Sequence, residues 1–289
     1  MELPALIDAQ TLSAHLDAPG LRVYDATVQL LRPEGGGPYT VLSGREDYER
    51  AHVPGAAFAD VAVELADPDA AFPFTVPSAA RFAAAAGRLG IGEGVHVVAY
   101  SQDVPMWATR LWWLLRHFGF DAVSVLDGGL PAWRAAGGEL SGEPASYPPA
   151  RFVARERHDD LAMRADVEAL LAGDGEACCL VNALTPPVFR GEGPGSQPRP
   201  GRIPGSVNVP WTEIVDPQTN RFRGVAEIGA AFARAGADGG TPVISYCGGG
   251  ISATVDLFAL ALLGREGARL YDGSLNEWAA DPALPLEVG

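Results

Sequence analysis

The sequence predicts an α/β protein of two tandem domains, each built on a parallel sheet flanked by helices. Short runs rich in β-forming residues alternate with longer apolar runs, as in parallel strands that are joined by helices. The same order of runs occurs twice. In the first half 27 residues separate Tyr100 from Asp127, and in the second half 26 residues separate Tyr246 from Asp272, each residue ending a predicted strand. This spacing predicts two copies of one unit.

The first half contains the clearer helix signals. Ser78 is a suitable N-cap for a helix over 79–89. Apolar residues surround most of the circumference of 106–118, which predicts a core helix whose tryptophans pack in the core and at the domain interface. A glycine-rich loop is expected at 35–38, and a Pro-Gly turn follows His52. Strands are predicted over 21–26, 94–100 and 122–126.

The second half repeats these elements in the same order. Cys179 opens its first strand, and a second Pro-Gly turn lies at Pro204 and Gly205. Gly, Ser and Pro cluster between the halves, where the apolar periodicity is lost. The predicted organisation is a first domain over 1–140, a linker over 141–155 and a second domain over 156–289. Further strands are predicted over 179–183, 242–246 and 270–272.

Composition narrows the class of protein. The chain of 289 residues is 47% hydrophobic and 20% charged, which is typical of a folded globular protein. A formal net charge of −15 makes nucleic acid and anionic membranes unlikely partners. The start of the chain has no basic region and apolar core of a signal peptide, and no apolar run is long enough to span a bilayer. Three cysteines, two of them adjacent, suggest neither a disulfide framework nor a metal site, so a cytoplasmic protein with reduced thiols is expected.

The stretch around Cys247 carries the strongest chemical signal. A predicted strand ends at this cysteine, three glycines follow, and a long apolar run predicts a buried helix. Glycine tolerates positive φ and a close approach of the backbone to a bound atom. Main-chain N–H groups at a helix start favour an anion, and such surroundings favour a thiolate. Cys247 is therefore predicted to be a nucleophile in a loop that holds negative sulfur.

The ordered motifs resemble the tandem-domain rhodaneses, the sulfurtransferases that include the thiosulfate and 3-mercaptopyruvate enzymes. The likeness covers essentially the whole chain, and any one motif alone would be weak evidence. It rests on residues 52–56 and 202–206, on 126–129 with Trp133, on 271–274 with Trp278, and on the loop 247–253.

The resemblance implies two rhodanese-like α/β domains, of which the first is catalytically silent: Ser101 follows its central strand where the second domain has Cys247. It implies that Cys247 accepts a sulfane sulfur from a small donor, becomes a persulfide and passes the outer sulfur to a thiol, with thioredoxin one candidate, or to cyanide. A thiolate nucleophile and a pocket for a negative persulfide are what such a transfer needs. No cofactor or metal is expected. The expected pocket is formed by Gly248, Gly249, Gly250, Ile251, Ser252 and Ala253.

The resemblance also favours 3-mercaptopyruvate as the donor. Thiosulfate-specific members have basic side chains directly after the cysteine, whereas this chain has Gly248 and Gly249. Mercaptopyruvate-type members have a serine where this chain has Gly249, and they hold the substrate carboxylate with two arginines. The nearest counterparts are Arg190 and Arg199. In an alternative alignment the usual first arginine falls at Val188, and Arg190 is then a shifted substitute. An arginine fork matches a carboxylate well.

Two other functions stay open as alternatives to this enzyme. One is a thiosulfate sulfurtransferase, and the other is a non-catalytic carrier that moves sulfur between proteins. A cysteine phosphatase is disfavoured, because it needs an arginine six residues after the cysteine, where this chain has Ala253. His52, Asp127 and Asp272 are expected to be turn or cap residues, and Cys178 and Cys179 to be structural.

Overall fold

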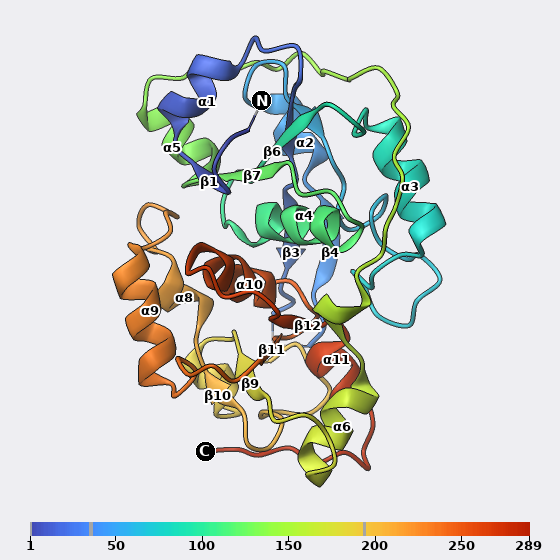
Figure 1. Ribbon diagram of the computed structural model, residues 1–289, viewed down its shortest axis with the longest axis vertical. Coiled ribbons are helices and arrows are strands. Elements are labelled where there is room, and N and C mark those ends of the chain that lie inside the picture. The colour runs from blue at the N-terminus through green and yellow to red at the C-terminus, as the bar shows by residue number, and fades with distance from the viewer. Residues whose placement is uncertain (1, 35–36, 193–194) are drawn as a thin grey trace.

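The computed structural model describes residues 2–34, 37–192 and 195–289. It contains two five-stranded parallel sheets, one in each half of the chain (Figure 1). Gly35 and Gly36 of the predicted glycine-rich loop lie outside the described residues. The predicted α/β class and tandem arrangement are confirmed.

The two sheets have the same topology. The first has the order β1 (Leu6–Ile7), β7 (Val123–Leu126), β6 (His96–Tyr100), β2 (Leu21–Asp25), β5 (Ala57–Phe58). The second has the order β8 (Leu161–Ala162), β12 (Arg269–Tyr271), β11 (Val243–Tyr246), β9 (Cys179–Asn182), β10 (Val207–Asn208). The central strands β6 and β11 are fully buried, as a parallel sheet covered on both faces requires.

Helices lie against both sheets. In the first half they are α1 (Ala9–His15), α2 (Arg45–Arg50), α3 (Ala79–Arg88), α4 (Met106–His117) and α5 (Gly129–Ala135). In the second half they are α6 (Arg164–Ala172), α7 (Pro186–Phe189), α8 (Trp211–Ile214), α9 (Val225–Arg234), α10 (Ala253–Leu262) and α11 (Ser274–Trp278). A 3-10 turn (His158–Asp160) precedes β8, and an antiparallel hairpin of β3 (Val28–Leu31) and β4 (Thr40–Ser43) extends from the first domain.

Several local predictions are confirmed, and others were missed. The Ser78 side chain caps α3 by accepting from the Arg81 amide, as predicted. Helix α2 was not predicted, because its polar sequence Arg-Glu-Asp-Tyr-Glu-Arg has no apolar stripe and adjoins a Pro-Gly turn. The hairpin β3–β4 was also missed.

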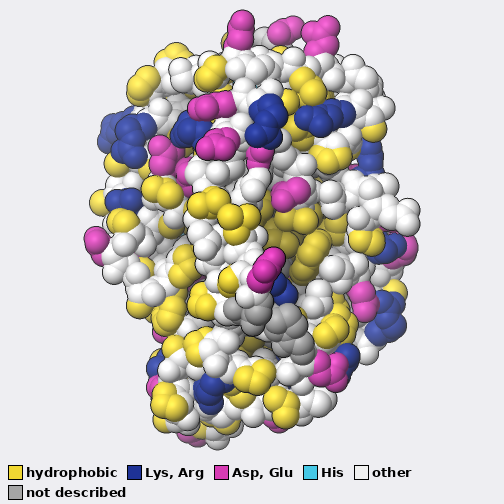
Figure 2. All heavy atoms as spheres, turned by 180° about the vertical axis from the view of Figure 1, so that it is seen from behind, with side chains coloured by type: hydrophobic (Ala, Val, Ile, Leu, Met, Phe, Trp, Pro, Cys, Tyr) yellow, Lys and Arg dark blue, Asp and Glu magenta, His cyan; other side chains and the backbone are white. Residues whose placement is uncertain are grey.

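The domains pack through the two helices that follow the central strands. Helices α4 and α10 lie side by side in the middle of the molecule (Figure 1). Trp112 of α4 meets Phe258 of α10 edge-on, with ring centroids 4.9 Å apart, and the Thr109 and Thr254 hydroxyls are hydrogen-bonded at 2.8 Å. One hydrophobic core cluster therefore contains residues of both domains. Seen from behind, a hollow with hydrophobic side chains at its bottom lies at mid-height of the molecule (Figure 2).

The Pro-Gly turns are structural parts of each domain. The Tyr246 hydroxyl, at the end of β11, accepts from the Ile203 amide at 3.0 Å, and in the first domain the Tyr100 hydroxyl accepts from the Val53 amide at 3.2 Å. Burial raises the pKa of Tyr246 to about 12. The ring nitrogens of the buried His52 lie 2.6 and 3.0 Å from main-chain carbonyl oxygens, which supports its assignment as a turn residue.

No helix in the described part of the chain is both long and apolar enough to cross a membrane.

Candidate active site

Cys247 lies at the carboxyl end of β11, the central strand of the second sheet, and 2% of its surface is exposed. The loop of three glycines leads from it into α10. Gly250 has φ +73°, and a Cβ at this position would lie 2.7 Å from the Asp272 carbonyl oxygen. Only glycine fits here without strain, because both the left-handed backbone and the close approach exclude a side chain.

Ser274, the first residue of α11, closes this loop from the end of the neighbouring strand β12. Its hydroxyl oxygen accepts from the amides of Cys247 and Gly250, each at 3.1 Å, and donates to the Tyr271 carbonyl at 2.7 Å. The Leu275 amide donates to the Cys247 carbonyl at 3.2 Å. One buried hydroxyl therefore holds both ends of the four-residue turn that starts at the cysteine.

The predicted amide pocket is only partly free. The Gly250 N–H is committed to Ser274. In residues 2–34, 37–192 and 195–289, no hydrogen-bond acceptor is recorded for the amides of Gly248, Gly249, Ile251, Ser252 and Ala253. These groups lie just before α10 or, for Ala253, at its first residue, where the helix dipole also favours negative charge.

Two carboxamide side chains occupy the space above the glycines that follow the cysteine. A Cβ on Gly248 would lie 2.6 Å from the Gln197 Nε2 atom, and one on Gly249 would lie 2.6 Å from the Asn276 Nδ2 atom. Gln197 comes from the segment after α7, and Asn276 from α11. Sequence reasoning missed both, because only the folded chain brings them to the loop.

A side chain of the first domain also contacts this loop. Arg110 of α4 is completely buried and donates to the Asp272 carboxylate at 2.7 Å and to the Gly250 carbonyl at 3.3 Å. The other carboxylate oxygen of Asp272 accepts from the Val76 amide at 2.8 Å. Asp272 was expected from the sequence to be a turn residue, and it also links the second domain to the first. An arginine inside an apolar run was the only sequence signal for this contact.

The two predicted substrate arginines lie in different surroundings. Arg190 follows α7, and its partly exposed guanidinium pairs with the Glu192 carboxylate at 2.8 Å. Arg199 donates to four main-chain carbonyls, those of Trp278, Ala279, Asp281 and Leu284, at 2.6–3.4 Å. Arg199 therefore fastens the C-terminal segment to the second domain, and a role for either arginine in substrate binding stays a prediction.

The other cysteines lie apart from this loop, at the start of β9. Burial raises the pKa of the Cys179 thiol, and the Cys178 sulfur lies 3.2 Å from an Arg269 nitrogen. In the described ranges no three His, Cys, Asp or Glu side chains gather as they would around a metal ion.

Asp256 is a second ionisable group close to the loop. It lies on the first turn of α10, completely buried, with the Ser245 hydroxyl 3.4 Å from one carboxyl oxygen. Burial raises its pKa well above the usual range. Burial therefore favours the protonated form of Asp256, which adds no negative charge that would oppose an anionic sulfur.

Comparisons with known proteins agree with this geometry. The rhodanese-like domain family matches residues 9–136 and 166–281. The chain is 33% identical over 285 residues to the 3-mercaptopyruvate sulfurtransferase of Escherichia coli K12, covering 97% of each chain. It is 38% identical over 215 residues to the putative thiosulfate sulfurtransferase SseB of Mycobacterium tuberculosis, covering 74% of each. Among solved structures, SseA from Escherichia coli, described as a 3-mercaptopyruvate sulfotransferase with the rhodanese fold, superimposes with a TM-score of 0.82 at 30% identity, over 94% of this chain and 99% of that one.

Proposed function

This chain belongs to the rhodanese family and is a sulfurtransferase, and from that premise we propose that Cys247 carries sulfur from 3-mercaptopyruvate to a thiol or cyanide as a persulfide. The observation that carries the proposal is the placement of Cys247 at the end of the central strand, in a turn held by Ser274 and adjoined by amides without an acceptor in the described chain. We further propose that residues 1–140 form a catalytically silent domain, that 141–155 are the linker and that 156–289 carry the reaction.

The proposed reaction has two steps. The Cys247 thiolate attacks the sulfur of 3-mercaptopyruvate, a sulfur–sulfur bond forms, and the carbon–sulfur bond breaks. The electron pair of that bond leaves on carbon as the enolate of pyruvate, which takes up a proton. An acceptor thiolate then attacks the outer sulfur, forms a new persulfide and releases the Cys247 thiolate; cyanide in the same role yields thiocyanate.

The loop's role is to hold the negative persulfide between these steps. Main-chain N–H groups that are fixed before the reaction stabilise a developing anion without reorganisation. We assign this role to the amides of Gly248, Gly249, Ile251, Ser252 and Ala253, and a structural role to that of Gly250.

The choice of donor rests on the neutral surroundings of the loop. Gln197 and Asn276 place carboxamides, not cations, above Gly248 and Gly249. Amide donors and one arginine suit a monocarboxylate better than a compact dianion. To bind a substrate carboxylate, Arg190 would have to give up one surface ion pair. Arg199 would have to give up hydrogen bonds to four main-chain carbonyls, so we favour Arg190.

Thiosulfate is the second candidate donor, because a relative 38% identical to this chain carries the name putative thiosulfate sulfurtransferase. The test is steady-state sulfur transfer to a thiol and to cyanide, with the two donors compared by kcat/KM. A preference for mercaptopyruvate that falls in Arg190→Ala supports the proposal. A preference for thiosulfate contradicts the donor assignment, and transfer between proteins without turnover of either donor favours the carrier alternative.

A further inference from the structure

We propose that Arg110, which belongs to the domain without a catalytic cysteine, is a positioning residue that fixes the Gly250–Ile251 peptide of the sulfur-binding loop. The inference rests on the proposed function, since it concerns the loop that would hold the persulfide. It assigns a role in the reaction to the first domain, whose own loop has a serine in place of the cysteine.

The first step of the argument is that Arg110 is aimed at the loop. Its guanidinium is completely buried and contacts three acceptors: the Asp272 carboxylate at 2.7 Å, the Gly250 carbonyl at 3.3 Å and the Phe74 carbonyl at 2.5 Å. The planar fork of an arginine can serve several acceptors in fixed directions at once, whereas a lysine is a single point charge. Two of the three acceptors belong to the second domain and one to the first.

The second step is that Gly250 is held from both sides. Its amide donates to the Ser274 hydroxyl and its carbonyl accepts from Arg110, while its α-carbon lies against Asp272. The peptide plane that contains the Gly250 carbonyl also contains the Ile251 N–H, and in a trans peptide the two groups point in opposite directions. Arg110 therefore fixes the direction of the Ile251 N–H, and its positive charge polarises that peptide so that the N–H becomes a better donor.

The third step is that Asp272 makes this contact rigid. Both of its carboxylate oxygens are bonded by the first domain, one by Arg110 and one by the Val76 amide at 2.8 Å. A displacement of about 1 Å at a catalytic group can cost on the order of 100-fold in rate. Packing between the domains thus affects the geometry of the sulfur loop through Arg110 and Asp272.

The pseudo-symmetric contact supplies a matched control. Asp127 takes the place of Asp272 in the first domain, and its carboxylate accepts from the Phe222 amide of the second domain at 2.8 Å. It lies beside the Ser101 loop, not beside Cys247. Asp127→Asn weakens the same kind of interdomain contact, so it reports the effect of looser packing alone.

The experiment compares Arg110→Lys, Arg110→Met, Asp272→Asn and Asp127→Asn in the full chain. We expect Arg110→Met and Asp272→Asn to lower kcat for mercaptopyruvate about 10- to 100-fold with KM little changed, because Arg110 does not contact the donor. Arg110→Lys should keep more of the thermal stability, since a charge remains beside Asp272, and still lose kcat. Asp127→Asn should lower stability without lowering kcat.

A second readout needs no sulfur donor. The rate at which iodoacetamide alkylates Cys247, followed by peptide mass spectrometry, should fall in the Arg110 and Asp272 variants and stay unchanged in Asp127→Asn. Failure of wild-type turnover with both donors would sink the proposed function, whereas the alkylation rates would still decide the role of Arg110. Folded Arg110→Lys or Asp272→Asn protein with wild-type kcat and alkylation overturns the inference, as does an equal loss in Asp127→Asn.

Discussion

In both domains a loop follows the central strand and enters a buried helix, but the two loops are closed by different groups. In the second domain the Leu275 amide donates to the Cys247 carbonyl, and in the first the Leu130 amide donates to the Ser101 carbonyl at 3.0 Å. The residue before each leucine has positive φ: Ser274 at +49° and Gly129 at +55°. The backbone frame is therefore shared, and the side chains distinguish the loops.

The hydroxyl of Ser274 has no counterpart in the first domain, where Gly129 has no side chain. Gln102 instead fixes the first loop, donating to the Asp25 carboxylate at 2.8 Å and to the Ala51 carbonyl at 3.0 Å. The Ser101 hydroxyl is buried without a hydrogen-bond partner among the described residues.

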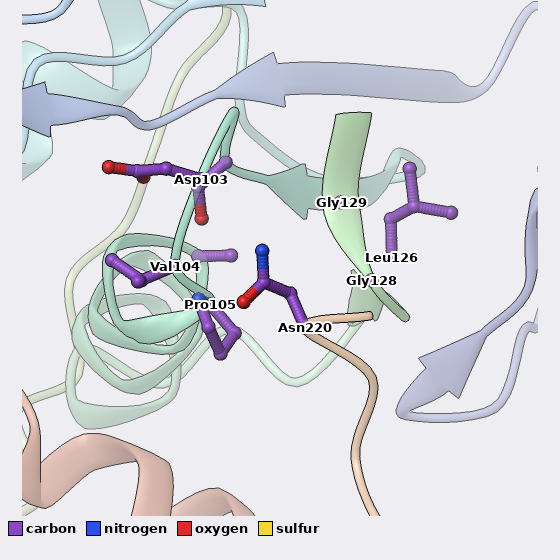
Figure 3. A pocket seen from close by; sticks show the side chains of 9 residues that line it. Asp103, Val104, Pro105, Leu126, Gly128, Gly129 and Asn220 are labelled. Atoms are coloured by element: carbon purple, nitrogen blue, oxygen red, sulfur yellow. The ribbon is translucent and has the colours of Figure 1, made fainter. Parts of the chain in front are cut away.

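The space beside Ser101 is small and is covered by the other domain. It is too narrow to hold a water molecule, and it is lined in part by Asp103, Pro105 and Gly129. Asn220 of the second domain extends over it toward Val104 and Pro105 (Figure 3). From this comparison we propose that the shared backbone frame supports a reactive loop where a thiol, the Ser274 hydroxyl and the glycine turn occur together.

The largest effect is expected from exchanging the cysteine between the loops. Cys247→Ser should abolish sulfur transfer, because a serine hydroxyl neither ionises readily nor forms a persulfide. Adding Ser101→Cys to that variant should not restore activity, because the first loop has no counterpart of Ser274. Steady-state assays with both donors check this, and restored turnover would contradict the contrast between the loops.

A smaller effect is expected from removing the Ser274 side chain, so that the second loop has a glycine at the position of Gly129 in the first. Ser274→Gly leaves the Cys247 and Gly250 amides without their shared acceptor and keeps the positive φ accessible. Removal of one oxyanion-hole donor costs about 100- to 1,000-fold in kcat in other enzymes. We expect a smaller loss here, because Ser274 holds the loop and does not itself donate to the anion. The measurement is kcat together with thermal unfolding. Wild-type kcat in Ser274→Gly would show that the hydroxyl does not set the loop geometry.

Gly249→Ser tests the space that Asn276 occupies. The new side chain meets the Asn276 carboxamide, so we expect kcat/KM to fall several-fold. Combining it with Asn276→Ala should recover part of the loss, giving a favourable coupling in a double-mutant cycle. Additive effects of the two changes would mean that the carboxamide does not take the place of a side chain at this position.

The smallest effect concerns stability and pH at Asp256. The pKa of Asp256 is raised in the folded chain, so the folded state keeps this proton where the unfolded chain has lost it. Stability from this group is present at low pH and is lost as pH rises from the unfolded pKa of about 3.8 toward the folded one. Asp256→Asn should therefore raise the midpoint of thermal unfolding by a few degrees at neutral pH, with the gain vanishing near pH 4. A gain that is independent of pH would contradict this cause.

The sequence predicted the main strands and helices better than the contacts that form the candidate site. Runs such as 96–100 and 243–246 are apolar and repeated, so they predict the central strands and, through the repeat, the second sheet. The edge strands have only two residues each, which is too short for any periodicity. The polar helix α2 and the hairpin β3–β4 depend on tertiary contacts rather than on a local pattern.

Within the site, Cys247 and its glycines could be predicted because a strand, a turn and a helix follow one another along the chain. The groups that hold this loop could not. Ser274 lies 27 residues after Cys247, and Arg110 lies 162 residues before Asp272. The family resemblance suggested Arg199 as a substrate residue, and that role stays a prediction. Its contacts with four carbonyls of the C-terminal segment could not be predicted, because they too join residues far apart in the chain.

The most direct test of the account is to locate the transferred sulfur. Protein treated with mercaptopyruvate, freed of donor and digested without reductant should show the added mass of one sulfur atom on the peptide that contains Cys247. The peptide that contains Cys178 and Cys179 should be unmodified, and the added sulfur should disappear when cyanide or a thiol is supplied. Sulfur on Cys178 or Cys179 instead, or turnover without any sulfur on Cys247, would contradict the assignment of the second loop as the reactive one.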